Sequence, residues 1–185
     1  MKRLLIVVDF QKDFVDGALG FAGAEKLEGP ILEKIAAYRE AGDLVWFTFD
    51  THHPDYLDTQ EGRKLPIPHC LDGTPGWKLY GKVADAQLDI DEVFLKPTFG
   101  SVDLCARLAK AQQIALSVGT LPFESIELVG LVSSICVLSN AVIARASCPD
   151  VPIIVDAACT AAADPVMNEK ALDVMENLQI EVVNR

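Results

Sequence analysis

Short runs of apolar residues alternate along the chain with segments in which apolar residues recur at helical spacing. Runs that are apolar on both faces are typical of strands buried in a parallel sheet, because helices cover both sides of such a sheet. We predict a strand in each of the following runs: Leu4–Val8, Leu44–Phe49, Val93–Leu95, Ile126–Val129, Pro152–Val155 and Ile180–Val183.

Longer segments between these strands carry a helical pattern. The first begins at Pro30, which suits the N1 position of a helix, and ends before Gly42, which offers a C-cap. Further helices are predicted from near Val102, over Ser134–Ala146 and over Asn168–Leu178. This alternation of strands and helices favours a doubly wound α/β fold, in which a parallel sheet carries helices on both faces.

The length, composition and charge of the chain indicate a globular protein and disfavour some kinds of partner. It has 185 residues, of which half are hydrophobic and 23% are charged, and this composition excludes intrinsic disorder. Since globular domains commonly run to about 100–200 residues, we expect a single domain over residues 1–185. The 16 Lys and Arg residues against 27 Asp and Glu give a net charge of −11, which disfavours a nucleic acid or an anionic membrane surface as partner.

The sequence gives little indication of a membrane span, a signal peptide or disulfide bonds. No apolar run reaches the roughly 18–20 residues of a membrane span, and Asp9 interrupts the apolar segment near the N-terminus. The five cysteines are an odd number without CxxC spacing, in a chain long enough to fold without disulfides. We interpret them as reduced thiols of a cytoplasmic protein.

Polar and nucleophilic side chains follow four of the predicted strands. Asp9 follows the first strand, Asp50 the second and Lys96 the third, and the segment Gly130–Cys136 follows the fourth. Ligands bind at the carboxyl ends of the strands in open α/β sheets. We therefore expect these residues to lie together at one edge of the sheet and to form the functional site.

Cys136 lies where the fourth strand turns into an apolar helix. The helix dipole there stabilises a thiolate, and main-chain N–H groups in the turn can stabilise negative charge on a substrate oxygen. A nearby carboxylate such as Asp9 can take the thiol proton, and the ammonium group of Lys96 favours the anion. The alternatives are that Cys136 is a small buried hydrophobe, that the two charges have capping or surface roles, and that Cys159, which also follows a strand, is the nucleophile.

A long polar stretch at residues 50–76 holds all three histidines of the chain, His52, His53 and His69. Asp50 and His52 form a compact ligand pair directly after a strand. Imidazole together with carboxylate suits zinc, iron or manganese, so the stretch is a candidate metal-binding loop. A single loop histidine is more commonly just solvated, but three in one loop favour a metal.

Three segments of the chain resemble the signature of the isochorismatase-like cysteine hydrolases. They are Asp9-Phe-Gln-Lys-Asp-Phe14 after the first strand, Lys96 after a middle strand, and Gly130-Leu-Val-Ser-Ser-Ile-Cys136-Val. The resemblance covers nearly the whole chain and implies a Rossmann-like sheet with an Asp–Lys–Cys triad. It implies that Asp9 is the general base and acid, that Lys96 is the supporting cation, and that Cys136 is the nucleophile.

The same resemblance implies a cis peptide bond between Leu131 and Val132. The N–H groups of Val132 and Cys136 would then form the oxyanion hole. The sequence departs from the family pattern at Ser133-Ser134, where pairs such as Thr-Asp are frequent.

Within this superfamily, a metal site of the form Asp-x-His with a later His marks the nicotinamidase branch. Some nicotinamidases add a histidine six residues after the first, where this chain has Asp58, and others add a glutamate about nine residues on, where it has Glu61. The resemblance therefore implies Asp50, His52, Glu61 and His69 as ligands, with Asp58 in reserve. His53, the third histidine, is interpreted as a loop residue that does not bind the metal.

The function implied is a metal-dependent amide hydrolase that converts nicotinamide to nicotinate and ammonia through a thioester. Its cofactor would be one divalent metal ion, with zinc favoured over iron or manganese, placed to bind the ring nitrogen of this small-molecule substrate. Phe14 and Phe99 are candidate walls for the flat ring, although ordinary core packing explains them equally well. A hydrolase of another amide or carbamoyl compound and a non-catalytic binding or assembly module are the alternatives. Family habit suggests a homo-oligomer.

Overall fold

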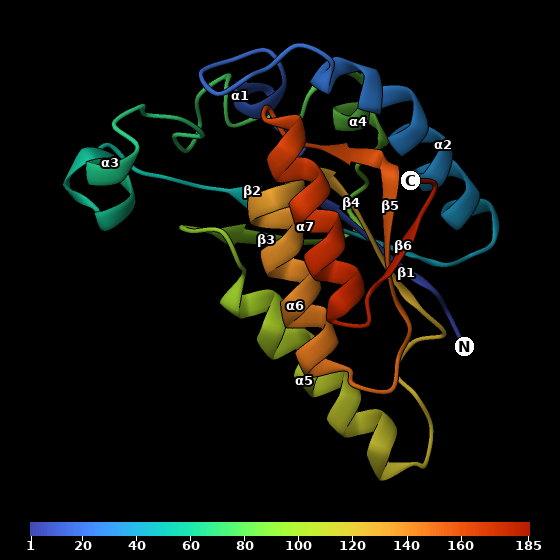
Figure 1. Ribbon diagram of the computed structural model, residues 1–185. Helices are drawn as coiled ribbons and strands as arrows, with labels where there is room; N and C mark the ends of the chain where they lie inside the picture. Colours follow the sequence, from blue (N-terminus) through green and yellow to red (C-terminus); the bar gives the residue numbers. More distant parts are fainter.

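The computed structural model describes all residues from Met1 to Arg185 and contains one six-stranded parallel sheet (Figure 1). The strands lie in the order β3-β2-β1-β4-β5-β6, and the order reverses between β1 and β4. A reversal of this kind opens a crevice at the carboxyl ends of the strands, where ligands bind in doubly wound folds. The strand bounds are β1 Leu4–Val8, β2 Leu44–Asp50, β3 Glu92–Lys96, β4 Ile126–Leu131, β5 Ile153–Ala161 and β6 Glu181–Val183.

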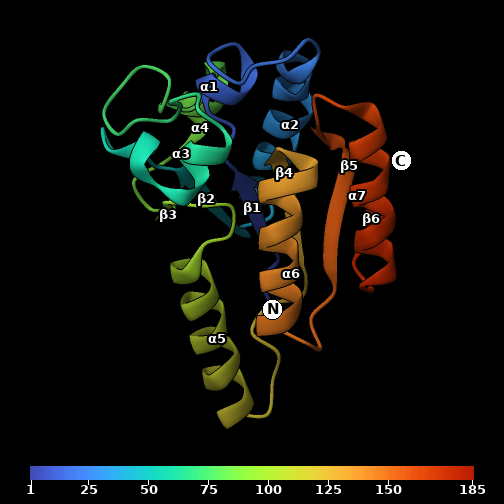
Figure 2. The same ribbon diagram turned by 60° about the vertical axis from the view of Figure 1, so that its left-hand side comes forward.

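Helices form a layer on each face of the sheet, as Figures 1 and 2 show, so the doubly wound prediction is confirmed. The α-helices are α1 Lys12–Val15, α2 Glu28–Glu40, α3 Gln60–Lys64, α4 Gly81–Ala86, α5 Val102–Ser117, α6 Leu138–Ser147 and α7 Pro165–Asn177. Short 3-10 turns form at η1 Ala24–Leu27 and η2 Tyr56–Asp58, and a π-helical turn forms at η3 Ser133–Val137. None of these helices has the length and apolar character needed to cross a lipid bilayer.

The core consists of two apolar clusters, one on each face of the sheet. In β1, alternate side chains face opposite ways, so that Leu4, Ile6 and Val8 join one cluster while Leu5 and Val7 join the other. The first cluster includes buried residues of α5, α6 and α7, and the second includes buried residues of α1, α2 and α4. Both faces of β1 are therefore buried, which explains its unbroken apolar run.

The structure corrects two helix and strand boundaries. Helix α2 begins at Glu28, so Pro30 is its third residue and not its first. Proline is tolerated there because the first N–H groups of a helix have no intrahelical partner. Strand β5 continues to Ala161 beyond the predicted end at Val155, with a register shift where it pairs with β4. Cys159 therefore lies inside a strand, and the prediction that it follows one is wrong.

Gly130 is the position where the sheet depends most directly on the absence of a side chain. Its φ of 111° lies in the left-handed region, and a Cβ there would lie 2.0 Å from the carbonyl oxygen of Val8 in the neighbouring strand. We expect Gly130→Ala to lower the free energy of unfolding by about 3 kcal/mol, because both the backbone and β1 would have to shift. Urea unfolding measures this difference.

Gly29→Ala is the matched control, because nothing lies within 4 Å of a Cβ added at this exposed position of α2. Its stability should be unchanged or slightly higher, since alanine favours a helix by about 0.8–1 kcal/mol over glycine. Equal stabilities of the two variants would contradict the close approach of Gly130 to β1.

Candidate active site

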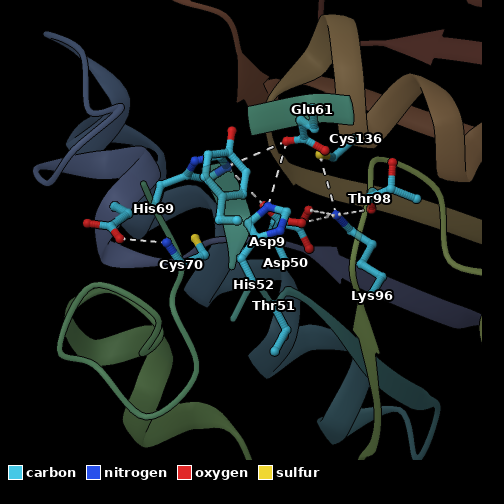
Figure 3. A network of polar contacts seen from close by, with 12 residues as sticks. Asp9, Asp50, Thr51, His52, Glu61, His69, Cys70, Lys96, Thr98 and Cys136 are labelled. Carbon is cyan, nitrogen blue, oxygen red and sulfur yellow. Dashed lines mark hydrogen bonds and ion pairs between the residues drawn. The ribbon is translucent and has the colours of Figure 1, made fainter. Parts of the chain in front are cut away.

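The predicted site residues meet at the carboxyl edge of the sheet. Asp9 directly follows β1 with a φ of 44°, while Asp50 and Lys96 are the last residues of β2 and β3. Cys136 lies in η3, directly after β4. Figure 3 shows these four side chains in one connected set of polar contacts. The sheet thus brings together residues that are separated by up to 127 positions, counted from residue 9 to residue 136.

The ammonium group of Lys96 lies at the centre of this set. Its Nζ is 2.6 Å from Oδ2 of Asp9, 3.3 Å from Oδ1 of Asp50 and 3.5 Å from Sγ of Cys136. It also donates to the carbonyl oxygen of Thr98 at 3.0 Å. Lys96 and Asp9 are essentially fully buried, so each charge depends on the other for its stabilisation.

Burial governs the protonation of the thiol and of Asp9. Burial raises the pKa of Cys136 well above its ordinary value, although the positive charge of Lys96 acts in the opposite direction. Burial likewise raises the pKa of Asp9, again against the effect of Lys96. Cys136 lies within a buried π-helical turn and not at an exposed helix N-terminus.

The turn that holds Cys136 follows a main-chain donor without an acceptor, the N–H of Val132. The peptide bond between Leu131 and Val132 is cis, as the family resemblance implies. The carbonyl oxygen of Val132 accepts from the N–H groups of Ile135 and Val137, whereas no main-chain carbonyl accepts from the N–H of Val132. Val132 and Cys136 both line the main cavity. The Val132 N–H is therefore available to a group bound there.

Asp50, His52 and His69 form a group of potential metal ligands whose donor atoms lie within 4.8 Å of one another. Nε2 of His52 and Nε2 of His69 lie 3.1 Å and 3.3 Å from Oδ2 of Asp50. The main-chain carbonyl oxygen of Ile67 lies 2.8 Å from Nδ1 of His69, which orients the ring. Oε1 of Glu61 lies 3.7 Å from Nε2 of His52 and 3.8 Å from Nε2 of His69.

The polar atoms of this group fit a divalent cation. Oε2 of Glu61 is buried without a hydrogen-bond partner. Burial and the charge of Asp50 raise the pKa of Glu61. For Asp50, burial is outweighed by hydrogen bonds from the two imidazoles, which lower its pKa. Two imidazoles with two carboxylates suit zinc, iron or manganese.

The other residues considered from the sequence lie outside this group. Asp58 is exposed in η2, and His53 is exposed in the loop that follows β2. The sequence alone left the choice between Asp58 and Glu61 open, because both follow His52 at short spacing. The turn of α3 places Glu61, and not Asp58, opposite the two buried histidines.

A cavity of about 360 Å³ connects the cysteine with the metal-binding group. The two aromatic candidates, Phe14 and Phe99, both line it, with Phe14 buried and Phe99 43% exposed. Much of the remaining wall was not predicted: Leu19, Phe21, Leu65, Ser134, Ile135, Ala162, Ala163, Asp164 and Met167. Residues Ala162–Asp164 directly follow β5, and a position after a strand is the sequence signal that could have placed them at the cavity. That signal could not be used because the strand was predicted to end at Val155.

The chain was compared with known proteins. The model of the isochorismatase domain matches residues 3–185. A nicotinamidase from Bacillus subtilis is 28% identical with a TM-score of 0.81, over 98% of this chain and 99% of that one. An N-carbamoylsarcosine amidase from Thermoplasma acidophilum is 26% identical with a TM-score of 0.74, over 98% and 95% of the two chains.

A pyrazinamidase from Pyrococcus horikoshii, solved in complex with zinc, shares the fold at 23% identity with a TM-score of 0.79, over 100% of both chains. A search of curated proteins found no match. The family match spans almost the whole chain and agrees with the six-stranded parallel sheet. The chain therefore belongs to the isochorismatase family and is a hydrolase.

Proposed function

We propose that this protein is a metal-dependent cysteine amidohydrolase that converts nicotinamide and water to nicotinate and ammonia. The observation that carries the proposal is the shared carboxylate of Asp50. Its Oδ1 contacts Lys96 of the Asp–Lys–Cys set, and its Oδ2 contacts both His52 and His69. A nucleophile and a metal-binding group therefore border one cavity, as an amide attached to a metal-binding ring requires.

Cys136 is the proposed nucleophile and Asp9 the proposed general base and acid. As Sγ of Cys136 bonds to the amide carbon, its proton passes to the carboxylate of Asp9 and the carbonyl electrons move to oxygen. Asp9 then returns the proton to the amide nitrogen and the carbon–nitrogen bond breaks. Ammonia is released, and the acyl group remains bound to Cys136 as a thioester. Attack by water, with Asp9 again accepting a proton, releases the carboxylic acid and restores the thiol.

Two further features stabilise charge during these steps. The ammonium group of Lys96 lies 3.5 Å from Sγ of Cys136 and favours the thiolate that forms as the proton leaves. The N–H groups of Val132 and Cys136 are the proposed oxyanion hole for the tetrahedral intermediate. Because the site is buried, these fixed donors act at low local dielectric and need no reorganisation.

Asp50, His52, Glu61 and His69 are the proposed metal ligands. A bound divalent ion would supply a Lewis-acid site for the ring nitrogen, and zinc is the metal we propose for this donor set. Phe14 and Phe99 would flank the ring, which suits an aromatic substrate. The residues of the chain thereby orient the carboxamide toward Cys136, and this orientation lowers the entropic part of the barrier.

A carbamoyl compound is the second candidate substrate, because the relative from Thermoplasma acidophilum is an N-carbamoylsarcosine amidase. That relative and the nicotinamidase have similar identities to this chain, 26% and 28%. The mostly apolar wall of the cavity favours an aromatic ring over a charged aliphatic carbamoyl compound. A non-catalytic module has no need of two buried charged groups, Asp9 and Lys96, beside the buried thiol of Cys136.

Ammonia release separates these candidates. Purified protein should be assayed with nicotinamide and with N-carbamoylsarcosine. Each assay compares protein loaded with zinc, iron or manganese with protein from which the metal has been removed by a chelator. We expect metal-dependent ammonia release from nicotinamide. Release from N-carbamoylsarcosine alone would identify the second candidate, and release from neither substrate with any of the metals would overturn the proposal.

Asp9→Asn should lower nicotinamide turnover by about 100-fold to 10,000-fold, because general acid–base catalysis contributes factors of that size. The amide side chain keeps a similar shape but accepts no proton from Cys136. Iodoacetamide should still alkylate Cys136, only more slowly. Mass spectrometry of the peptide that contains Cys136 measures this rate directly.

Thr48→Val is the matched control for Asp9→Asn. It removes the hydroxyl that donates to Oδ1 of Asp9 at 2.7 Å but keeps the carboxylate and its ion pair with Lys96. Its activity should fall far less than that of Asp9→Asn. Equal alkylation rates in the wild type and in Asp9→Asn would mean that Asp9 does not activate the thiol.

A further inference from the structure

Asn140 connects the cysteine turn with the loop that follows β3. It is fully buried in α6, one helical turn after Cys136. Its Nδ2 donates to the carbonyl oxygen of Cys136 at 2.8 Å and to the carbonyl oxygen of Phe99 at 3.1 Å. Its Oδ1 accepts from the N–H of Ser101 at 3.0 Å. Both donor hydrogens and one acceptor site of this amide are therefore used.

The loop held by Asn140 lies directly against α6. A Cβ added at Gly100 would lie 2.8 Å from Cδ1 of Ile143, so the loop backbone packs closely on this side chain of the helix. The carbonyl oxygen of Thr98 accepts from Lys96, and the hydroxyl of Ser101 caps the first turn of α5. The loop is thus fixed on one side by Lys96 and on the other by Asn140.

We infer that Asn140 is a positioning residue that sets the geometry of Cys136 relative to the Phe99 wall of the cavity. The inference rests on the proposed function only in taking Cys136 as nucleophile and Phe99 as substrate wall. The Asn140 side chain does not line the cavity, so it acts through the two residues that do. It joins them by main-chain carbonyls, which makes the link independent of the rotamers of the thiol and the ring.

Asn140→Ala removes the whole link. It leaves two buried carbonyl groups and one buried N–H without their partner, so the loop and the cysteine turn have to move to satisfy them. A displacement of about 1 Å at a reacting group can cost about 100-fold in rate. We expect kcat for nicotinamide to fall by about 10-fold to 100-fold and KM to rise. Alkylation of Cys136 by iodoacetamide should be about tenfold slower, because the thiol loses its contact with Lys96.

Asn140→Thr separates the two halves of the link. A threonine hydroxyl in a helix can donate to the carbonyl four residues earlier, which here belongs to Cys136. It is too short to reach Phe99 and Ser101 as well. This variant should therefore keep the alkylation rate of Cys136 within about twofold of the wild type, while KM rises as the Phe99 wall loosens.

Gln112→Ala is the matched control, because it also removes a buried amide from a helix, but from α5 and away from the cavity. Its Oε1 has no hydrogen-bond partner, so this variant leaves no buried group newly unpaired and should change neither KM nor the alkylation rate. All four proteins are measured in the metal-loaded form, with kcat and KM for nicotinamide, the alkylation rate by mass spectrometry, and Tm.

Wild-type values of KM and alkylation rate in Asn140→Ala would overturn the inference, as would the same changes in Gln112→Ala. If Asn140→Ala does not fold, an unchanged KM in Asn140→Thr overturns it. A wild type without nicotinamide turnover would instead refute the proposed function. The alkylation rates of Asn140→Ala and Gln112→Ala would then still decide the role of Asn140, since they need no substrate.

Discussion

Cys136→Ala should lose at least about 1,000-fold of its nicotinamide turnover while it keeps the wild-type fold, because only the thiolate can form the acyl intermediate. The substitution removes a single sulfur atom from a buried turn beside Lys96. It adds no bulk and leaves the ion pair between Asp9 and Lys96 intact. Steady-state ammonia release and circular dichroism together measure the two parts of this expectation.

Cys159→Ala is the control for this experiment. Cys159 is as buried as Cys136, but it lies inside β5 and does not line the cavity. Burial raises the pKa of both thiols, so what distinguishes Cys136 is its place in the cavity and the ammonium group of Lys96 beside it. Turnover should therefore be close to that of the wild type. If Cys136→Ala kept more than a few per cent of activity, the nucleophile assignment would be wrong.

His52→Ala should purify without stoichiometric metal and with nicotinamide turnover reduced at least about 100-fold, because the variant loses one of two imidazole ligands. The fold should persist, since neither apolar cluster of the core includes a residue of the metal-binding group. Elemental analysis after loading with zinc, iron or manganese measures the occupancy. The neighbouring His53→Ala is the matched control, because His53 is exposed and lies outside the group. Equal metal content in the two variants would contradict the ligand assignment.

Glu61→Ala and Asp58→Ala test the fourth ligand in the same way. Glu61 lies within 4 Å of both imidazoles, whereas Asp58 is exposed. Glu61→Ala should therefore bind metal more weakly, with turnover partly restored by added divalent metal, while Asp58→Ala should change little. Full occupancy in Glu61→Ala together with depletion in Asp58→Ala would transfer the role to Asp58. A wild type that binds no metal when metal is supplied would refute the site.

The sequence by itself determined the parallel sheet and the edge where the site lies. The apolar run of β1 is buried on both faces, so its composition reports its environment directly. Since strands of a parallel sheet end at the same edge, the residues after them had to converge, which placed Asp9, Lys96 and Cys136 together. This inference depended only on where strands end, and a strand end is visible locally as a change from apolar to polar residues.

Contacts between distant side chains were decided by the tertiary structure alone. Nothing in the chain near Asp50 shows that one oxygen of its carboxylate faces Lys96 while the other faces His52 and His69. The link from Asn140 to the Phe99 loop is of the same kind. Such contacts depend on how helices pack on the sheet, and a local pattern of apolar residues does not encode that packing.

The protonation state of Cys136 also required the structure. The sequence placed the thiol after a strand and before a helix, where an exposed helix terminus favours a thiolate. In the folded protein a π-helical turn lies at this position and the thiol is buried, so desolvation raises its pKa and the helix terminus is not its dominant environment. Burial is a property of the whole packed molecule, whereas the order of strand, cysteine and helix is a property of the chain.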